Sequence, residues 1–229
     1  MITRRNIARV VAEFVGTALL TAIILSVTRS QLPIAYFIAL AAGLVVLMTT
    51  LVLNGVSGAH LNPVITLGLW SVRRFKTLSA VAYIVAQFAG AYAAYLLFTY
   101  FVGQSWPDPV NDFKAKILVA EAIGAFVFSL GWAAAVYQRM EIGKFAATIS
   151  VSLVLAMLIA SVGTGTAMPG FVNPAVALGL RSFEWGTYIL GPALGAIIGF
   201  NLYGLLFAPA RELSDEIEHA AVKASEKKK

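Results

Sequence analysis

Two short segments place an asparagine and a proline in front of an apolar stretch that is too short to cross a membrane. The segments are Asn62-Pro63-Val64 and Asn173-Pro174-Ala175. Asn is a preferred N-cap and Pro is favoured at the first helical position, so each motif predicts the start of a helix. About ten helical residues rise roughly 15 Å, half of a hydrocarbon core about 30 Å thick. Each segment is therefore expected to be a re-entrant half-helix, and the two N-termini are expected to meet near the midplane.

Hydrogen bonding to a neutral solute is the chemistry that such a meeting point offers. The amide groups of Asn62 and Asn173 supply N–H donors, and two positive helix ends repel cations. Non-helical backbone at membrane depth is tolerated only where protein or a water-filled cavity surrounds it. Both Asn residues are therefore predicted to line a lumen. Ordinary capping of buried half-helices is the alternative role, and the two roles are compatible.

Few other side chains inside the apolar stretches could do chemistry. Glu13 and Glu121 could relay protons, but no further acid, His or Lys forms a chain with either of them. His60 could gate or bind a metal, but it has no partner ligands at a suitable spacing, so a structural role is favoured. The sequence has no cysteine. We predict no catalytic residues, no metal site and no cofactor, and therefore no enzyme.

Six long apolar stretches must position these residues. The 229-residue chain is 59% hydrophobic and 12% charged, which is too little charge to cover a soluble globule. Each stretch is near the roughly 20 residues that cross a hydrocarbon core. They lie at about 10–28, 34–53, 78–102, 117–137, 145–163 and 186–207. The sequence thus predicts an all-α membrane protein with six transmembrane helices and two re-entrant half-helices.

The basic residues predict the orientation of the chain. The net charge is +6, but Lys and Arg are spread between the hydrophobic segments instead of forming one face, which argues against a nucleic-acid partner. Thirteen of them fall in one set of connecting segments and four in the other. By the positive-inside rule, both termini are expected to be cytoplasmic. We predict a multi-pass protein of the cell (inner) membrane.

The sequence repeats itself in two halves. Residues 12–16 recur at 120–124 with an offset of 108, the Asn-Pro motif recurs with an offset of 111, and residues 83–91 recur at 188–196 with an offset of 105. Three spans per half is an odd number, so the second copy must enter from the opposite side. Such an inverted repeat places a solute path between the halves. The predicted parts are a first half (1–102), an extracellular linker (103–116), a second half (117–208) and a charged cytoplasmic tail (209–229).

These motifs together resemble the aquaporin (major intrinsic protein) family over essentially the full length of the chain. The motifs around Glu13 and Glu121, the run from Ser57 to Pro63 and the duplicated Asn-Pro carry the resemblance. It implies an aquaporin-like fold, a homotetramer in the lipid bilayer with one pore per subunit, and a passive channel for water or small uncharged solutes such as glycerol. It also implies that Glu13 and Glu121 brace the re-entrant loops through backbone hydrogen bonds, with His60 as a further structural group.

The selectivity filter is where the sequence departs from the family. An Arg commonly follows the second Asn-Pro-Ala there and narrows the outer mouth together with an aromatic residue on the second span. Here Val176 and Ala42 occupy those positions, and the fifth span contributes Ser161 or a residue near Met157. The Asp that is typical of the glycerol branch is also missing. We therefore expect a wider and less polar mouth than that of a strict water channel.

Two other classes of membrane protein could contain an inverted repeat. A secondary transporter would use it for alternating access, but such proteins usually need intramembrane ionisable sites, and this sequence has almost none. An intramembrane enzyme would need a nucleophile with a base, or a set of metal ligands. A passive channel remains the prediction, with the transporter as its alternative.

Overall fold

Eight α-helices and one π-helical turn make up the computed structural model, which describes residues 3–30, 34–104, 112–164, 170–182 and 184–208. Most of the predicted linker (103–116) and the whole predicted tail (209–229) lie outside these residues. The long helices are α1 (Arg4–Arg29), α2 (Ala35–Ser57), α4 (Thr77–Val102), α5 (Ala115–Tyr137), α6 (Ile142–Thr164) and α8 (Gly191–Leu206), the last preceded by the π turn η1 (Gly186–Leu190). The short helices are α3 (Pro63–Ser71) and α7 (Pro174–Gly179).

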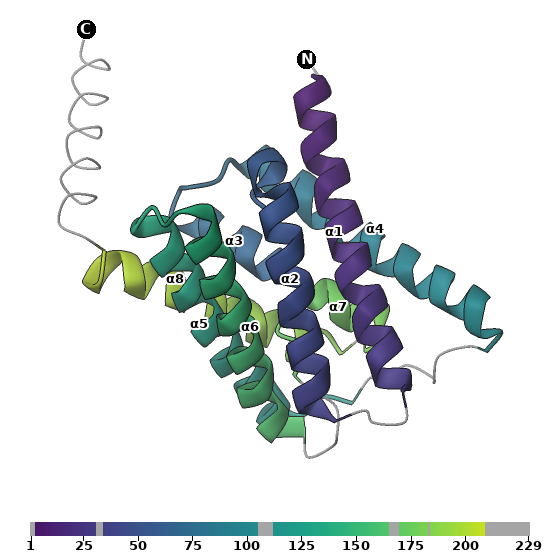
Figure 1. Ribbon diagram of the computed structural model, residues 1–229. Coiled ribbons are helices and arrows are strands. Elements are labelled where there is room, and N and C mark those ends of the chain that lie inside the picture. Colours follow the sequence, from purple (N-terminus) through teal and green to yellow (C-terminus); the bar gives the residue numbers. More distant parts are fainter. Residues whose placement is uncertain (1–2, 31–33, 105–111, 165–169, 183, 209–229) are drawn as a thin grey trace, which may run out of the picture.

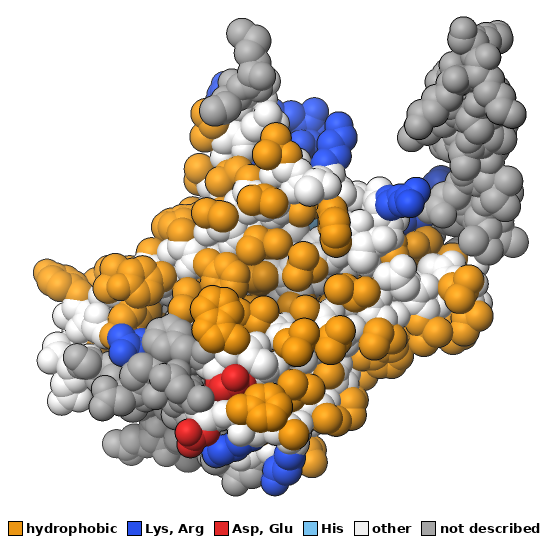
Figure 2. All heavy atoms as spheres, turned by 180° about the vertical axis from the view of Figure 1, so that it is seen from behind, with side chains coloured by type: hydrophobic (Ala, Val, Ile, Leu, Met, Phe, Trp, Pro, Cys, Tyr) orange, Lys and Arg blue, Asp and Glu red, His pale blue; other side chains and the backbone are white. Residues whose placement is uncertain are grey.

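Six helices of the described chain are long and apolar enough to cross a membrane, as the hydropathy pattern predicts. Their outer faces carry large hydrophobic side chains such as Leu44, Val85 and Val162. Figure 2 shows hydrophobic side chains over the middle of one face, with Lys and Arg toward its ends. An apolar band between charged ends matches the lipid solvent. Together with the absence of strands among the described residues, these helices confirm the predicted fold class.

The two short helices begin at the two Asn-Pro motifs (Figure 1). The side-chain oxygen of Asn62 accepts from the N–H of Val64 at 3.0 Å, and that of Asn173 accepts from the N–H of Ala175 at 3.1 Å. Helix α3 has nine residues, but α7 has only six. The expected length of about ten residues is therefore too long for the second half-helix.

Each half-helix ends in the same way. The residue that follows its last turn is an Arg in the left-handed region, Arg73 (φ 60°) after α3 and Arg181 (φ 62°) after α7. The next N–H then bonds back five residues, from Arg74 to Leu69 and from Ser182 to Ala177. These bonds satisfy carbonyls that the helix end leaves free. The repeat thus continues through both half-helices to their C-termini.

Small residues allow the first and third spans of each half to touch. A Cβ placed on Gly90 of α4 would lie 2.2 Å from the carbonyl oxygen of Phe14 in α1. A Cβ on Gly195 of α8 would lie 2.0 Å from the carbonyl oxygen of Ala122 in α5. Only glycine fits at either crossing, which is how helices pack closely in lipid. The small residues at these two crossings therefore serve the packing of the helices.

Each half-helix packs against the third span of the other half, α3 on α8 and α7 on α4. The ring of Phe200 in α8 lies against Gly68 of α3, and the backbone of Ala91 in α4 lies beside Gly179 of α7. This exchange ties the two halves into one body. Contacts with α8 and α4 hold the two half-helices in place. Their Asn ends lie at the space between α1, α2, α5 and α6.

The last span starts with a wide turn. Glu184 accepts hydrogen bonds from the N–H groups of Gly186 and Thr187 at the beginning of η1. Burial alone would raise the pKa of Glu184, but the hydrogen bonds from Thr187 and Gly186 outweigh it and lower the pKa. Pro192 has no N–H to continue the helical pattern, and the π turn that precedes it lets α8 proceed.

Candidate functional site

A narrow buried cavity runs past the ends of both half-helices, and four spans contribute to its wall. Each span supplies two residues four positions apart, which places them on one face of the helix. They are Leu20 and Ile24 on α1, Ala42 and Val46 on α2, Phe128 and Trp132 on α5, and Leu153 and Met157 on α6. The pairs on α1 and α5 are 108 residues apart, and those on α2 and α6 are 111 apart, the same offsets as in the sequence repeat. The wall therefore has the inverted symmetry of the chain.

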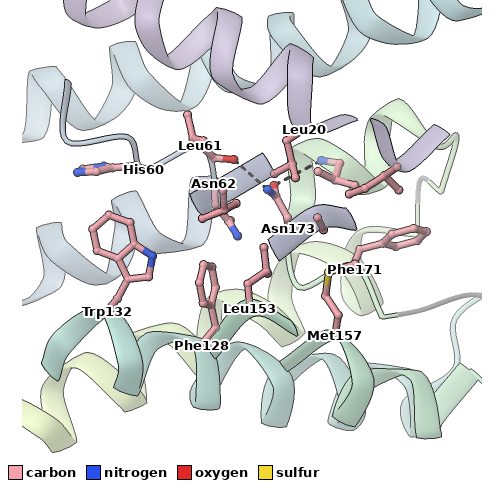
Figure 3. A pocket seen from close by; sticks show the side chains of 14 residues that line it. Leu20, His60, Leu61, Asn62, Phe128, Trp132, Leu153, Met157, Phe171 and Asn173 are labelled. Atoms are coloured by element: carbon pink, nitrogen blue, oxygen red, sulfur yellow. Dashed lines mark hydrogen bonds between the residues drawn. The ribbon is translucent and has the colours of Figure 1, made fainter. Parts of the chain in front are cut away.

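Asn62 and Asn173 meet in the middle of this cavity (Figure 3). Asn62 donates from Nδ2 to the carbonyl of Val172 at 2.9 Å, and Asn173 donates from Nδ2 to the carbonyl of Leu61 at 2.9 Å. Each Asn thus binds the residue that precedes the other Asn. An amide nitrogen carries two hydrogens, so one donor per Asn remains after these crossed bonds. Both residues also cap their helices, so capping and lining occur together.

The carboxyl groups of Glu13 and Glu121 hold the two re-entrant loops. Glu13 accepts from the N–H groups of His60 and Leu61 at 3.0 and 2.7 Å. Glu121 accepts from the N–H groups of Phe171 and Val172, both at 2.7 Å. Both carboxyl groups are fully buried. These contacts fit the bracing role that the resemblance implies. Neither carboxyl group is among the described lining residues of the cavity.

The loops need this support because their backbone is strained. Leu61 and Val172, which precede the two Asn residues, have φ values of 52° and 51°. Left-handed backbone is costly for side chains other than Gly, above all for a β-branched residue such as Val. In this conformation the N–H of each residue donates to a Glu, and its carbonyl accepts from the opposite Asn. The strain is therefore coupled to the crossed contacts at the centre.

His60 lies both in a structural network and on the cavity wall. Its Nδ1 is 3.1 Å from Thr66 Oγ1, and its ring packs on Phe75, Tyr83 and Trp132. The described residues contain no group of three His, Cys, Asp or Glu that could hold a metal. The structural interpretation of His60 fits these contacts, although its place on the cavity was not predicted.

The predicted filter positions are only partly brought together. Ala42 and Val176 line the cavity, and both are buried. Ser161 is not among the lining residues, and its hydroxyl bonds the Leu158 carbonyl. Met157, one helical turn earlier, contributes from the fifth span instead. Met168 of the preceding loop lies outside the described residues.

The expected widening of the mouth stays a prediction, because the structure gives the size of the cavity as a whole and not the width at Val176. Met157 and Phe171 line the same cavity as Val176, and the Phe171 ring rests on Tyr188 with centroids 5.2 Å apart. The space open to the centre of a water-sized molecule is about 10 Å³, about what a single water needs. The expectation of low polarity holds, since Ile24, Met157, Phe171 and Val176 are all apolar.

Several lining residues could not have been found from the sequence. Phe128, Trp132 and Leu153 lie in stretches that are apolar on every side, so hydropathy does not separate the lumen-facing residues from those facing lipid. The repeat offers one signal. For the lining residues of the four spans, the positions 108 or 111 away in the other half also line the cavity.

Comparison with known families agrees with this geometry. A family model described as "Major intrinsic protein" matches residues 2–203. The chain belongs to the major intrinsic protein family. Aquaporin Z of Photorhabdus laumondii is 28% identical over 230 residues, which cover 87% of this chain and 97% of that protein. The predicted family is thereby confirmed.

Other major intrinsic proteins from distant organisms are similar to this one. A probable aquaporin AqpM of Archaeoglobus fulgidus is 32% identical over 194 residues, covering 75% of this chain and 76% of that protein. Aquaporin-5 of Sus scrofa is 32% identical over 200 residues, covering 82% and 76%. Among solved structures, the aquaglyceroporin from Plasmodium falciparum superposes with a TM-score of 0.72 at 22% identity, covering 91% of this chain and 99% of that one. That likeness confirms the fold.

Proposed function

We propose that this major intrinsic protein is a passive channel for water and other uncharged solutes of similar size, which pass through the cavity between its two halves. The observation that carries the proposal is the meeting of Asn62 and Asn173 inside a buried cavity with a mostly apolar wall. A solute oxygen accepts from the free amide hydrogens there and finds few other partners along the wall. Flux then follows the concentration gradient, and no reaction is catalysed.

Size favours water over glycerol. Open space of about 10 Å³ fits a single water, so glycerol passes only if side chains move. Aquaporins and an aquaglyceroporin both occur among the similar proteins, and the narrowness of this cavity supports the first kind of selectivity. Met157 and Phe171 are the side chains that set the limit on the Val176 side.

Cations are excluded without a filter Arg. The N-terminus of α3 and the Asn amides present positive dipole ends and donors to the lumen. Most of the described lining residues are apolar and supply no ligand that could replace an ion's hydration shell. His60 is the one ionisable group among the described lining residues, and this scarcity also weighs against a transporter that couples solute to ions.

The same proposal includes a homotetramer with one pore per subunit. The protein lies in the inner membrane of the cell, and both of its termini are in the cytoplasm. Large apolar residues remain exposed on every span, including Leu51 on α2 and Leu155 on α6, so there is surface for subunits as well as for lipid. Arg4, Arg5 and Arg9 at the start of α1 supply the positive charge that favours the cytoplasmic side. Native mass spectrometry and protease protection test the two statements.

Stopped-flow light scattering on proteoliposomes tests the solute. We expect osmotic water permeability well above that of protein-free vesicles and little glycerol permeability. Ala42→Phe is the plugging control, since Ala42 is fully buried on the cavity wall and a phenyl ring there fills the lumen. If wild type and Ala42→Phe shrink vesicles equally fast, solute does not pass through this cavity and the proposal fails.

A further inference from the structure

The indole of Trp132 is a buried hydrogen-bond donor that the fold does not use. Its side chain is 2% exposed, and its Nε1 has no hydrogen-bond partner among the described residues. An indole N–H is a donor only, and a buried Trp N–H usually finds a partner. The same residue lines the cavity. No partner is left among the described residues, and Nε1 itself has less than 1 Å² of accessible surface, so a solute in the cavity reaches it only when adjacent side chains move.

The surroundings of Trp132 fix the ring in place. It makes edge-to-face contacts with His60 and Phe145. The ring centroids are 5.7 and 5.2 Å apart, and the angles between the ring planes are 86° and 88°. Figure 3 shows its nitrogen on the side of the ring that is turned toward Asn62 and away from His60. The edge of the ring that carries the N–H is thus turned toward the side of Asn62. Since neighbouring rings hold the indole, the donor keeps this direction.

The inverted repeat shows that this donor has no counterpart. The residue equivalent to Trp132 is Ile24, with the offset of 108, and the residue equivalent to His60 is Phe171, with the offset of 111. Both equivalents are apolar. One half of the cavity therefore contains an indole N–H beside a His, while the other half has hydrocarbon at the matching positions.

We propose that Trp132 Nε1–H is a third solute-binding donor of the pore, after the amides of Asn62 and Asn173, on the side of the membrane where α1 begins. The ligand class is a small neutral molecule with an exposed acceptor oxygen, and water is the smallest member. A solute leaving Asn62 toward that side accepts from the indole in place of the hydrogen bond that it loses. On the opposite side the described lining residues Ile24, Met157, Phe171 and Val176 offer no side-chain donor.

The proposal rests on the channel function given above, and its main test is Trp132→Phe. This change keeps an aromatic ring in the packing with His60 and Phe145 and removes the N–H. We expect osmotic water permeability per channel to fall about 2- to 10-fold, as for one lost hydrogen bond. Trp185→Phe is the matched control, since Trp185 is 73% exposed and lies outside the pore lining; it is expected to conduct like the wild type.

The outcomes separate the two claims. If wild type conducts water and folded Trp132→Phe conducts equally well, the donor role is wrong while the channel function stands. If wild type conducts no water, the channel function fails and the donor role fails with it. If Trp132→Phe alone loses conductance and Trp185→Phe does not, the donor role is supported.

A second measurement does not need Trp132 to be replaced. The chain has four tryptophans, so a variant with Trp70→Phe, Trp106→Phe and Trp185→Phe keeps Trp132 as its single indole. In an ¹⁵N NMR experiment on this protein in detergent micelles, we expect the indole N–H to exchange with water protons. An N–H that stays protected from exchange over days would mean that it is sealed in the packing, and would overturn the proposal.

Discussion

Replacing Phe171 with Ala should convert a water-selective pore into one that also passes glycerol. The Phe171 side chain is 5% exposed, lines the cavity and rests on Tyr188. Its backbone N–H, which bonds Glu121 at 2.7 Å, is unaffected by the substitution. The change thus removes a ring from the narrow part of the lumen and leaves the brace of the loop in place.

The size of the effect follows from the packing around that ring. Forcing extra atoms into a packed space costs about 1–3 kcal/mol, and each 1.4 kcal/mol of barrier is about a tenfold change in rate. We therefore expect glycerol permeability to rise about tenfold or more. A Phe→Ala change in a closed core costs about 3–5 kcal/mol of stability. Because water can fill part of the space on the pore side, we expect a loss of about 2–3 kcal/mol here.

The assay is stopped-flow light scattering with water and glycerol gradients on the same proteoliposomes. Phe200→Ala is the control for general loosening, because Phe200 is fully buried between α3 and α8 and is not among the described lining residues. It should destabilise the protein without changing the ratio of the two permeabilities. If folded Phe171→Ala keeps the wild-type ratio, Phe171 does not set the size limit and the reasoning on the narrow filter is refuted.

Further predictions concern the packing, the central amides and the missing thiols. Gly90→Ala and Gly195→Ala should each lower stability in detergent by about 1–3 kcal/mol, whereas Gly55→Ala, where a Cβ has nothing within 4 Å, should not; equal melting temperatures in all three would contradict the close helix crossings. Asn62→Asp and Asn173→Asp should each increase cation leak, because a carboxylate would then stand at the meeting point of the half-helices; unchanged conductance in both folded variants would remove these residues from the pore. Micromolar mercury should leave water flux unchanged, since the chain has no cysteine and block of this kind needs a thiol; inhibition without unfolding would show the reasoning to be wrong.

Much of the architecture follows from local rules that a single sequence displays. Long apolar stretches give the six spans, and Asn followed by Pro gives the start of each half-helix. The repeat gives the inversion, and glycine at Gly90 and Gly195 gives the close crossings. Each of these depends on residues near one another in the chain, or on two copies of one pattern.

The pore itself depended on contacts between distant segments. The crossed bonds of Asn62 and Asn173 join residues more than a hundred positions apart, through backbone carbonyls that have no sequence signature. The expectation of a wide mouth was based on Val176 and Ala42, and the sequence did not show that Phe171 also lines the cavity. Trp132 could not be separated from other apolar residues of its span before the helix was placed.

Water flux into and out of wild-type proteoliposomes tests the channel most directly. The flux is measured against the osmotic gradient, with and without imposed Na⁺ and H⁺ gradients. The cavity has Asn62 and Asn173 at its centre and no carboxyl group on its described wall, so nothing there couples solute to ions. We predict a flux that rises linearly with the osmotic gradient and does not change with either ion gradient. A flux that saturates and depends on an ion gradient, or one no faster than in protein-free vesicles, would contradict a passive channel.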